Sequence, residues 1–180
     1  MFRIPFSFKK CVITAAASGL AIAGLFVATP GSAQADSAYV RIVPTSNPFL
    51  FLDVSEGSKG DGAKIIQWSL SGDNQVWYFH ETAPGDFEIV NKHSGKCITT
   101  NGQGGQLMQW LCKGIPTQIW NVTRATGTPG PGVQNTMIIN PVSRYSAMGV
   151  AGNSRTQGAA IVLGESLGTP NQRFNLLAAA

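Results

Sequence analysis

The chain has 180 residues, and its 13 basic and nine acidic residues give a formal net charge of +4 and a pI of about 9.2. The charge is unevenly distributed: Arg3, Lys9 and Lys10 precede every acidic residue, and from Asp36 onward ten basic residues face nine acidic ones, a net charge of +1. Without a basic stripe or a cluster of lysines and arginines, the body of the chain lacks the electrostatic footprint of a nucleic-acid-binding protein.

Residues 1–35 have the features of a secretory signal peptide. The basic n-region is followed by an apolar stretch at 12–28 and by Ala33-Gln34-Ala35, a cleavage site of the A-x-A type. An uncleaved anchor is the alternative, because 17 apolar residues approach the lower limit for a spanning helix. Cys11 follows two lysines rather than a lipobox, which argues against a lipoprotein. We expect a secreted, extracellular monomer of residues 36–180 with no membrane attachment after cleavage, long enough for one domain.

Twelve short runs of apolar, β-branched and aromatic residues follow the leader, each bounded by Gly, Asn, Asp, Ser or Pro, as strands are. They cover residues 39–43, 49–52, 64–68, 76–81, 87–90, 96–100, 106–112, 119–123, 137–140, 145–150, 160–163 and 173–177. No stretch after the leader sustains the apolar spacing of three and four residues that indicates an amphipathic helix. The sequence therefore predicts an all-β domain in which helix is nearly absent.

A Gln-x-aromatic motif occurs three times in this body. The copies are Gln75-Val76-Trp77, Gln118-Ile119-Trp120 and Gln172-Arg173-Phe174. The aromatic residues are 43 and 54 positions apart, and each copy follows the same succession of strand, turn, strand and turn, which indicates three internal repeats. A Gly/Pro/Thr-rich insertion at 125–135 explains the longer second spacing. Four strands per unit would also suit a propeller blade, but a propeller needs about four to eight blades. We expect Trp77 and Trp120 to be buried.

Cys97 and Cys112 are the only cysteines after the leader. They lie 15 residues apart within the second repeat, and an even cysteine count in a secreted chain favours a disulfide. A zinc site is the alternative, but no Cys or His pair at ligand spacing accompanies them.

No arrangement of residues indicates catalysis. His80 and His93 have no partners that would form a triad, and no Gly-x-Gly-x-x-Gly precedes a helix. The acidic residues are scattered over turns, so nothing favours a glycosidase pair. We expect a non-enzymatic protein without cofactor or metal.

The residues of the second repeat carry a family resemblance. Cys97-Ile98, Gln109-Trp110-Leu111-Cys112 and Gln118-Ile119-Trp120, within three units of similar length, make the chain resemble the ricin-B-type (Gln-x-Trp repeat) β-trefoil lectins over residues 39–177. The resemblance implies a β-trefoil of twelve strands in three pseudo-threefold repeats, with a six-stranded barrel capped by three hairpins. It also implies a cystine within the second repeat, with Phe51 and Leu70 at the equivalent positions of the first.

The same resemblance implies one shallow sugar pocket per repeat, built from an Asp, an aromatic ring and an Asn before the Gln. The chemistry suits a sugar, because a carboxylate accepts hydrogen bonds from vicinal hydroxyls and an aromatic face packs on pyranose C–H groups. The first repeat keeps the set, with these candidate site residues: Asp53, Gln67, Trp68, Asn74 and Gln75. We expect Asp53 at a solvent-facing turn.

The carboxylate position is lost in the other two repeats, where it is Thr99 and Gly149. The predicted function is therefore non-catalytic binding of a galactose-like or xylan-like glycan mainly through the first repeat. The alternative is a β-trefoil protein-interaction or inhibitor module with degenerate sugar sites.

Overall fold

Strands connected by short turns make up most of this computed structural model, which describes residues 39–125, 136–141 and 145–179. All of them belong to the compact unit of residues 35–180. The predicted signal peptide and all but the first residue of the predicted insertion at 125–135 lie outside the described residues. Within the described ranges, no helix is long and apolar enough to cross a membrane.

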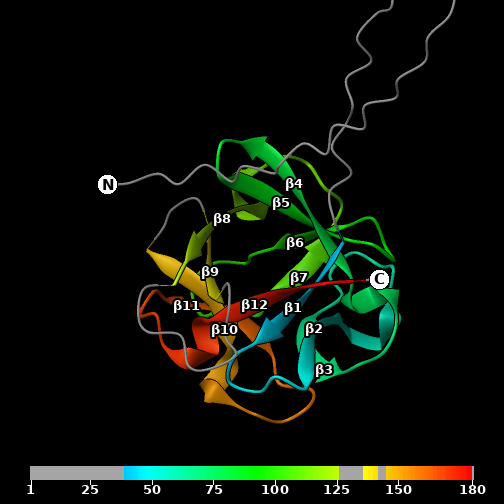
Figure 1. Cartoon of the computed structure of the whole chain (residues 1–180). Helices are drawn as coiled ribbons and strands as arrows, with labels where there is room; N and C mark the ends of the chain where they lie inside the picture. The colour runs from blue at the N-terminus through cyan, green and yellow to red at the C-terminus, as the bar shows by residue number, and fades with distance from the viewer. Residues whose placement is uncertain (1–38, 126–135, 142–144, 180) are drawn as a thin grey trace, which may run out of the picture. The chain divides into compact units, whose positions relative to one another are not determined.

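Each of the twelve predicted runs overlaps one observed strand, and most of the strands extend one or two residues beyond the run (Figure 1). The strands are β1 (Val40–Pro44), β2 (Leu50–Val54), β3 (Ile65–Ser69), β4 (Trp77–Ala83), β5 (Asp86–Asn91), β6 (Cys97–Thr99), β7 (Met108–Trp110), β8 (Ile119–Arg124), β9 (Thr136–Pro141), β10 (Ser146–Val150), β11 (Ile161–Glu165) and β12 (Phe174–Ala178). The described helical residues form single 3-10 turns: η1 (Ser55–Gly57), η2 (Asp73–Gln75), η3 (Pro116–Gln118), η4 (Ala151–Asn153) and η5 (Pro170–Gln172). The prediction of an all-β domain is confirmed.

Six strands close into a ring. Antiparallel pairings run from β4 to β1, β12, β9, β8 and β5, and β5 pairs with β4 again. The remaining strands form the hairpins β2–β3, β6–β7 and β10–β11. Isolated bridges join each hairpin to the other two: Lys64 to Met108, Ile66 to Ala160, and Gln106 to Val162. The architecture is thus a six-stranded barrel with three mutually bridged hairpins.

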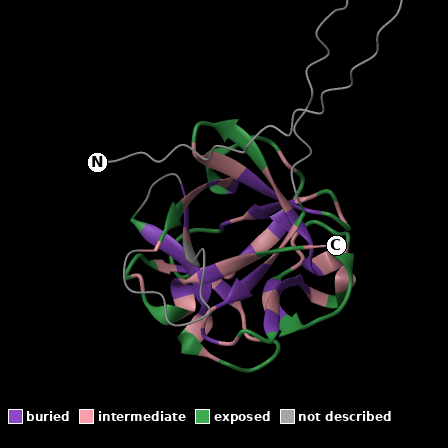
Figure 2. Ribbon diagram, viewed as in Figure 1, coloured by how far each residue is buried: buried purple, intermediate pink, exposed green. Residues whose placement is uncertain are grey.

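Residues from all three sequence repeats fill the core. Trp77, Trp120 and Phe174 are fully buried, which confirms the prediction for the two tryptophans. Trp77 Nε1 donates to Leu52 O (3.2 Å) and Trp120 Nε1 to Ile98 O (3.0 Å), so each indole nitrogen is paired where water cannot reach it. Figure 2 shows buried residues concentrated along the strands and exposed ones at the turns.

The glutamine of each motif bridges the turn that follows a hairpin. In each copy Oε1 accepts from a backbone N–H and Nε2 donates to a backbone carbonyl. The partners are Ser71 and Ser69 for Gln75, Lys113 and Leu111 for Gln118, and Leu167 and Glu165 for Gln172. An amide side chain offers a donor and an acceptor on two separate atoms at its end, which suits glutamine to bridging a backbone carbonyl and a backbone N–H in this turn.

Candidate functional site

A buried carboxylate lies near the end of strand β2. Asp53 is 3% exposed, and its Oδ2 accepts hydrogen bonds from Asn74 Nδ2 (2.9 Å), Gln75 Nε2 (2.8 Å) and Ser71 Oγ (3.4 Å). The expectation of a solvent-facing turn at Asp53 is wrong, because the chain leaving β3 folds back over this end of the hairpin. Within the described residues these bonds all converge on Oδ2, so Oδ1 is the oxygen left for a ligand.

Asn74 and Gln75 hold this carboxylate in different ways. All the polar atoms of Gln75 are used inside the protein, since Nε2 also donates to Ser69 O (2.7 Å) and Oε1 accepts from Ser71 N (2.8 Å). Asn74 is only half-buried; its Nδ2 also donates to Val54 O (3.1 Å), and its Oδ1 makes one long contact, 3.4 Å from Ser71 Oγ. Gln75 therefore positions Asp53, whereas Asn74 has an oxygen that can still reach a ligand.

Trp68 presents a partly open aromatic surface on β3. It pairs across the hairpin with Phe51, two residues before Asp53, so side-chain alternation puts all three residues on the same face. Trp68 is 38% exposed. A Cβ added to Gly158, which has φ +82°, would lie 3.5 Å from Trp68 Cζ3, so the indole packs against backbone of the third repeat. The exposed part of the ring is available for stacking.

Gln67 lies on the other face of the same strand. It is fully buried, and its Nε2 donates to Ser154 O (3.2 Å) and Thr156 O (2.7 Å). Gln109 does the same in the second repeat, with Nε2 donating to Ser58 O (2.8 Å) and Gly60 O (2.9 Å). The structure thus brings Asp53, Asn74 and Gln75 together, with Trp68 on the same face, but places Gln67 apart from them as a tie between repeats.

Ser71 contacts Asp53, but no motif in the sequence marks it as a site residue. It donates to Asp53 through its hydroxyl and to Gln75 through its backbone. The backbone contact could not have identified it, because Lys113 and Leu167 make the equivalent bond with different side chains.

The other two repeats keep some of these hydrogen bonds but have no carboxylate at the position of Asp53. In the second, Gln118 Nε2 donates to Thr99 Oγ1 (3.0 Å), so a hydroxyl takes the place of the carboxylate. In the third, Asn171 Nδ2 donates to Val150 O (2.9 Å) just as Asn74 does to Val54, but the carboxylate position is Gly149. A Cβ there would lie 3.0 Å from Gln172 Cγ, so this repeat has no room for a carboxylate without rearrangement.

Burial changes the pKa of the Asp53 carboxyl. Burial raises its pKa above the ordinary value of 3.8, and the hydrogen bonds from Gln75, Asn74 and Ser71 lower it in part. The native state therefore binds a proton at a higher pH than the unfolded chain does. The contribution of this group to the free energy of unfolding must therefore rise as the pH falls through the raised pKa. It is fully present below the pKa that Asp53 has in the unfolded chain.

We expect this linkage to show in the difference between the parent and an Asp53→Asn variant. The variant carries no buried charge, so near neutral pH it should be at least as stable as the parent. On acidification the parent should gain stability relative to the variant. Urea unfolding of both proteins at a series of pH values measures this. If the free energy of unfolding of the variant minus that of the parent stays constant or increases on acidification, the raised pKa is contradicted.

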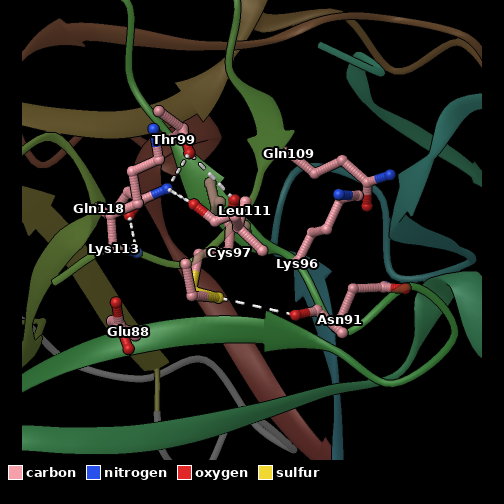
Figure 3. The surroundings of a disulfide bond; sticks show 12 residues. Glu88, Asn91, Lys96, Cys97, Thr99, Gln109, Leu111, Lys113 and Gln118 are labelled. Atoms are coloured by element: carbon pink, nitrogen blue, oxygen red, sulfur yellow. Dashed lines mark hydrogen bonds between the residues drawn. A yellow bond between two sulfur atoms is a disulfide. The ribbon is translucent and has the colours of Figure 1, made fainter. Parts of the chain in front are cut away.

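The predicted disulfide between Cys97 and Cys112 is present, with the Cα atoms 5.1 Å apart. Glu88 lies beside it, its carboxylate accepting from Gly114 N (2.9 Å), and Gln118 spans the adjoining turn (Figure 3). Ligand atoms of Glu88 and both cysteines lie within 4.8 Å of one another, an arrangement that could hold a metal ion. Because the two sulfurs are bonded to each other, neither is a thiolate ligand in this state.

The closed barrel, the three bridged hairpins and the glutamine-braced aromatic core define a β-trefoil. Solved structures of the same fold include a designed threefold-symmetric protein, ThreeFoil, at 27% identity and TM-score 0.69 over 78% of this chain and 99% of that one. The earthworm R-type lectin C-half, solved with GalNAc, is 22% identical, with TM-score 0.63, over 79% of this chain and 99% of its own. An exo-β-1,3-galactanase from Clostridium thermocellum is 26% identical, with TM-score 0.71, over 81% of this chain but only 31% of its own.

The family model described as ricin-type beta-trefoil lectin domain-like matches residues 73–163. The chain belongs to this family, as the Gln-x-Trp motifs indicated. No curated protein sequence matches it significantly.

Proposed function

We propose that this protein binds carbohydrate without catalysis, through a site in the first of three pseudo-threefold repeats formed by its twelve strands. The observation that carries the proposal is the Asp53 carboxylate, braced through Oδ2 by Asn74, Gln75 and Ser71. Such a group would not be kept buried and braced merely to form a turn, because taking a carboxylate out of water is costly.

The geometry suggests how each residue acts on a sugar. Asp53 Oδ1 accepts hydrogen bonds from vicinal hydroxyls, Asn74 Oδ1 accepts another, and the open part of Trp68 packs against pyranose C–H groups. Gln75 holds the carboxylate, and Gln67 holds the hairpin against the third repeat. Galactose-like sugars are favoured as ligands, since the earthworm lectin of the same fold was solved with GalNAc; xylan-like sugars are the second choice.

Asp53→Asn should abolish monosaccharide binding while the fold survives. The asparagine can still accept the hydrogen bonds from Asn74 and Gln75, but it cannot offer a charged acceptor to two hydroxyls. The parent affinity should be on the order of millimolar, because each sugar hydrogen bond adds only about 0.5 to 1.5 kcal/mol. Titration of galactose and xylose followed by NMR measures it, with retained backbone shifts showing that the variant is folded.

Thr99→Ser is the matched control in the second repeat, because it keeps the hydroxyl bonded to Gln118 and alters no carboxylate. Its affinity should equal that of the parent. Sugar-induced shifts that survive in Asp53→Asn would refute the proposed site. No shifts with any glycan of an array would refute sugar binding and favour a protein-interaction or inhibitor module.

We also propose that the protein is exported after cleavage of residues 1–35. The support is the basic, apolar and A-x-A sequence of the leader. N-terminal sequencing of protein recovered from the medium should begin at Asp36; material that begins at Met1 or stays with the membrane would contradict it.

A further inference from the structure

A cationic side chain lies beside the proposed sugar site. Arg41 projects from β1 with its guanidinium carbon 5.9 Å from the centroid of the Phe51 ring, and its Nη1 donates to Gly72 O (3.5 Å). Gly72 is the residue immediately before η2, the turn that carries Asn74 and Gln75. The guanidinium is therefore placed by the same segment that covers Asp53.

The segment that Arg41 contacts also carries groups of the proposed sugar site. Ser71, the neighbour of Gly72, donates to Asp53, and a Cβ added to Gly72 would lie 3.4 Å from Asn74 Oδ1. Phe51, on which Arg41 lies, is two residues before Asp53 on the same face of β2. A ligand held by Asp53 and Asn74 consequently has Arg41 at its edge.

Arg41 forms no ion pair with an acidic group of the described residues. The recorded ion pairs are Lys92 with Asp73 (3.2 Å) and Lys96 with Asp61 (2.6 Å). Asp73, next to Gly72, is thus already engaged by Lys92. The guanidinium is held by a ring and a carbonyl, which leaves N–H groups for an anion.

Arg41 lies in the first repeat, which also contains the Asp53 carboxylate. Arg41, Glu88 and Ile138 each precede a fully buried isoleucine in the barrel: Ile42, Ile89 and Ile139. Two of them hydrogen-bond to the turn before the motif glutamine: Arg41 donates to Gly72 O (3.5 Å), and Glu88 accepts from Gly114 N (2.9 Å). Ile138 lies near the corresponding turn, since a Cβ added to Gly168 would be 3.8 Å from its Cδ1. This position therefore carries a different type of side chain in each repeat. It is cationic in the first repeat, which also contains the proposed sugar-binding residues.

We infer that the first repeat prefers an acidic sugar, one that bears a carboxylate or a sulfate. The inference rests on the proposed function, since Asp53 and Asn74 must hold the neutral hydroxyls. Arg41 takes the acidic group, because its planar guanidinium matches a carboxylate or sulfate with two parallel hydrogen bonds. The acidic group must point away from Asp53, whose own charge repels it.

Matched sugar pairs test this at low salt by NMR titration. Galactose is compared with galacturonate and with galactose 6-sulfate, and xylose with glucuronate, which differs from it by the added carboxylate. At least one acidic sugar should bind the parent about two- to fivefold more tightly than its neutral partner, the upper part of the range for an exposed charged pair. The carboxylate and sulfate arms then show which acidic group is preferred.

Arg41→Gln should remove this preference and leave the neutral affinity unchanged, and Arg41→Lys should keep part of it. Lys113→Gln, which removes an exposed charge from the second repeat, is the matched control and should change nothing. Neutral and acidic sugars that bind the parent equally, or a preference that survives Arg41→Gln, would overturn the inference while the sugar site stands. A parent that binds neither kind of sugar would instead overturn the proposed function.

Discussion

Replacing Trp120 by alanine should lower the free energy of unfolding by about 3 to 5 kcal/mol, as large-to-small changes do in a packed core. Trp120 is fully buried, and its Nε1 donates to Ile98 O (3.0 Å). The variant leaves a cavity and also removes the partner of that buried carbonyl, and both losses act in the same direction.

Urea unfolding monitored by far-ultraviolet circular dichroism measures the change. Trp110→Ala is the matched control, because Trp110 belongs to the same repeat but is 39% exposed. It should cost distinctly less than the change at Trp120. Equal losses at the two positions, or an unfolding curve of Trp120→Ala that matches the parent, would contradict the structural role of the repeat motif.

Removing the disulfide with the double change Cys97→Ala and Cys112→Ala should cost about 3 kcal/mol, the chain-entropy value for a loop of this size. The cysteines are 15 residues apart and close the β6–β7 hairpin. That hairpin has a ladder of only three residue pairs, whereas β2–β3 and β10–β11 each have five, so the covalent bond links the hairpin with the shortest ladder.

Comparison of the parent with and without a thiol reductant provides the control. The reduced parent should unfold at nearly the same urea concentration as the double variant. Unreduced protein prepared without residues 1–35, which include Cys11, should show no titratable thiol. Two titratable thiols in the unreduced protein would rule out the bond, and equal stability with and without it would contradict its contribution.

Much of the fold could be predicted from the sequence because the signals are local. Runs of apolar residues between turn formers located the strands that the structure describes, and the period of the Gln-x-aromatic motif suggested their grouping into repeats. Trp77 and Trp120 could be assigned to the core because the motif recurs beside them. The disulfide could be predicted because residues 36–180 contain no other cysteines.

The sequence by itself determined which residue types the first repeat supplies to the proposed site; the exposure and the contacts of these residues depend on tertiary structure. Asp53 looks like a turn residue within its own segment and is buried only because Ser71 to Gln75 fold back over it. In the sequence, Gln67 resembles a ligand-binding amide. In the folded protein its Nε2 donates to the carbonyls of Ser154 and Thr156, 87 and 89 residues away. Arg41 belongs to no motif and comes beside the site because the strand that carries it lies next to the turn before η2. Hydrogen bonds between repeats depend on how the barrel closes, and no local pattern encodes that closure.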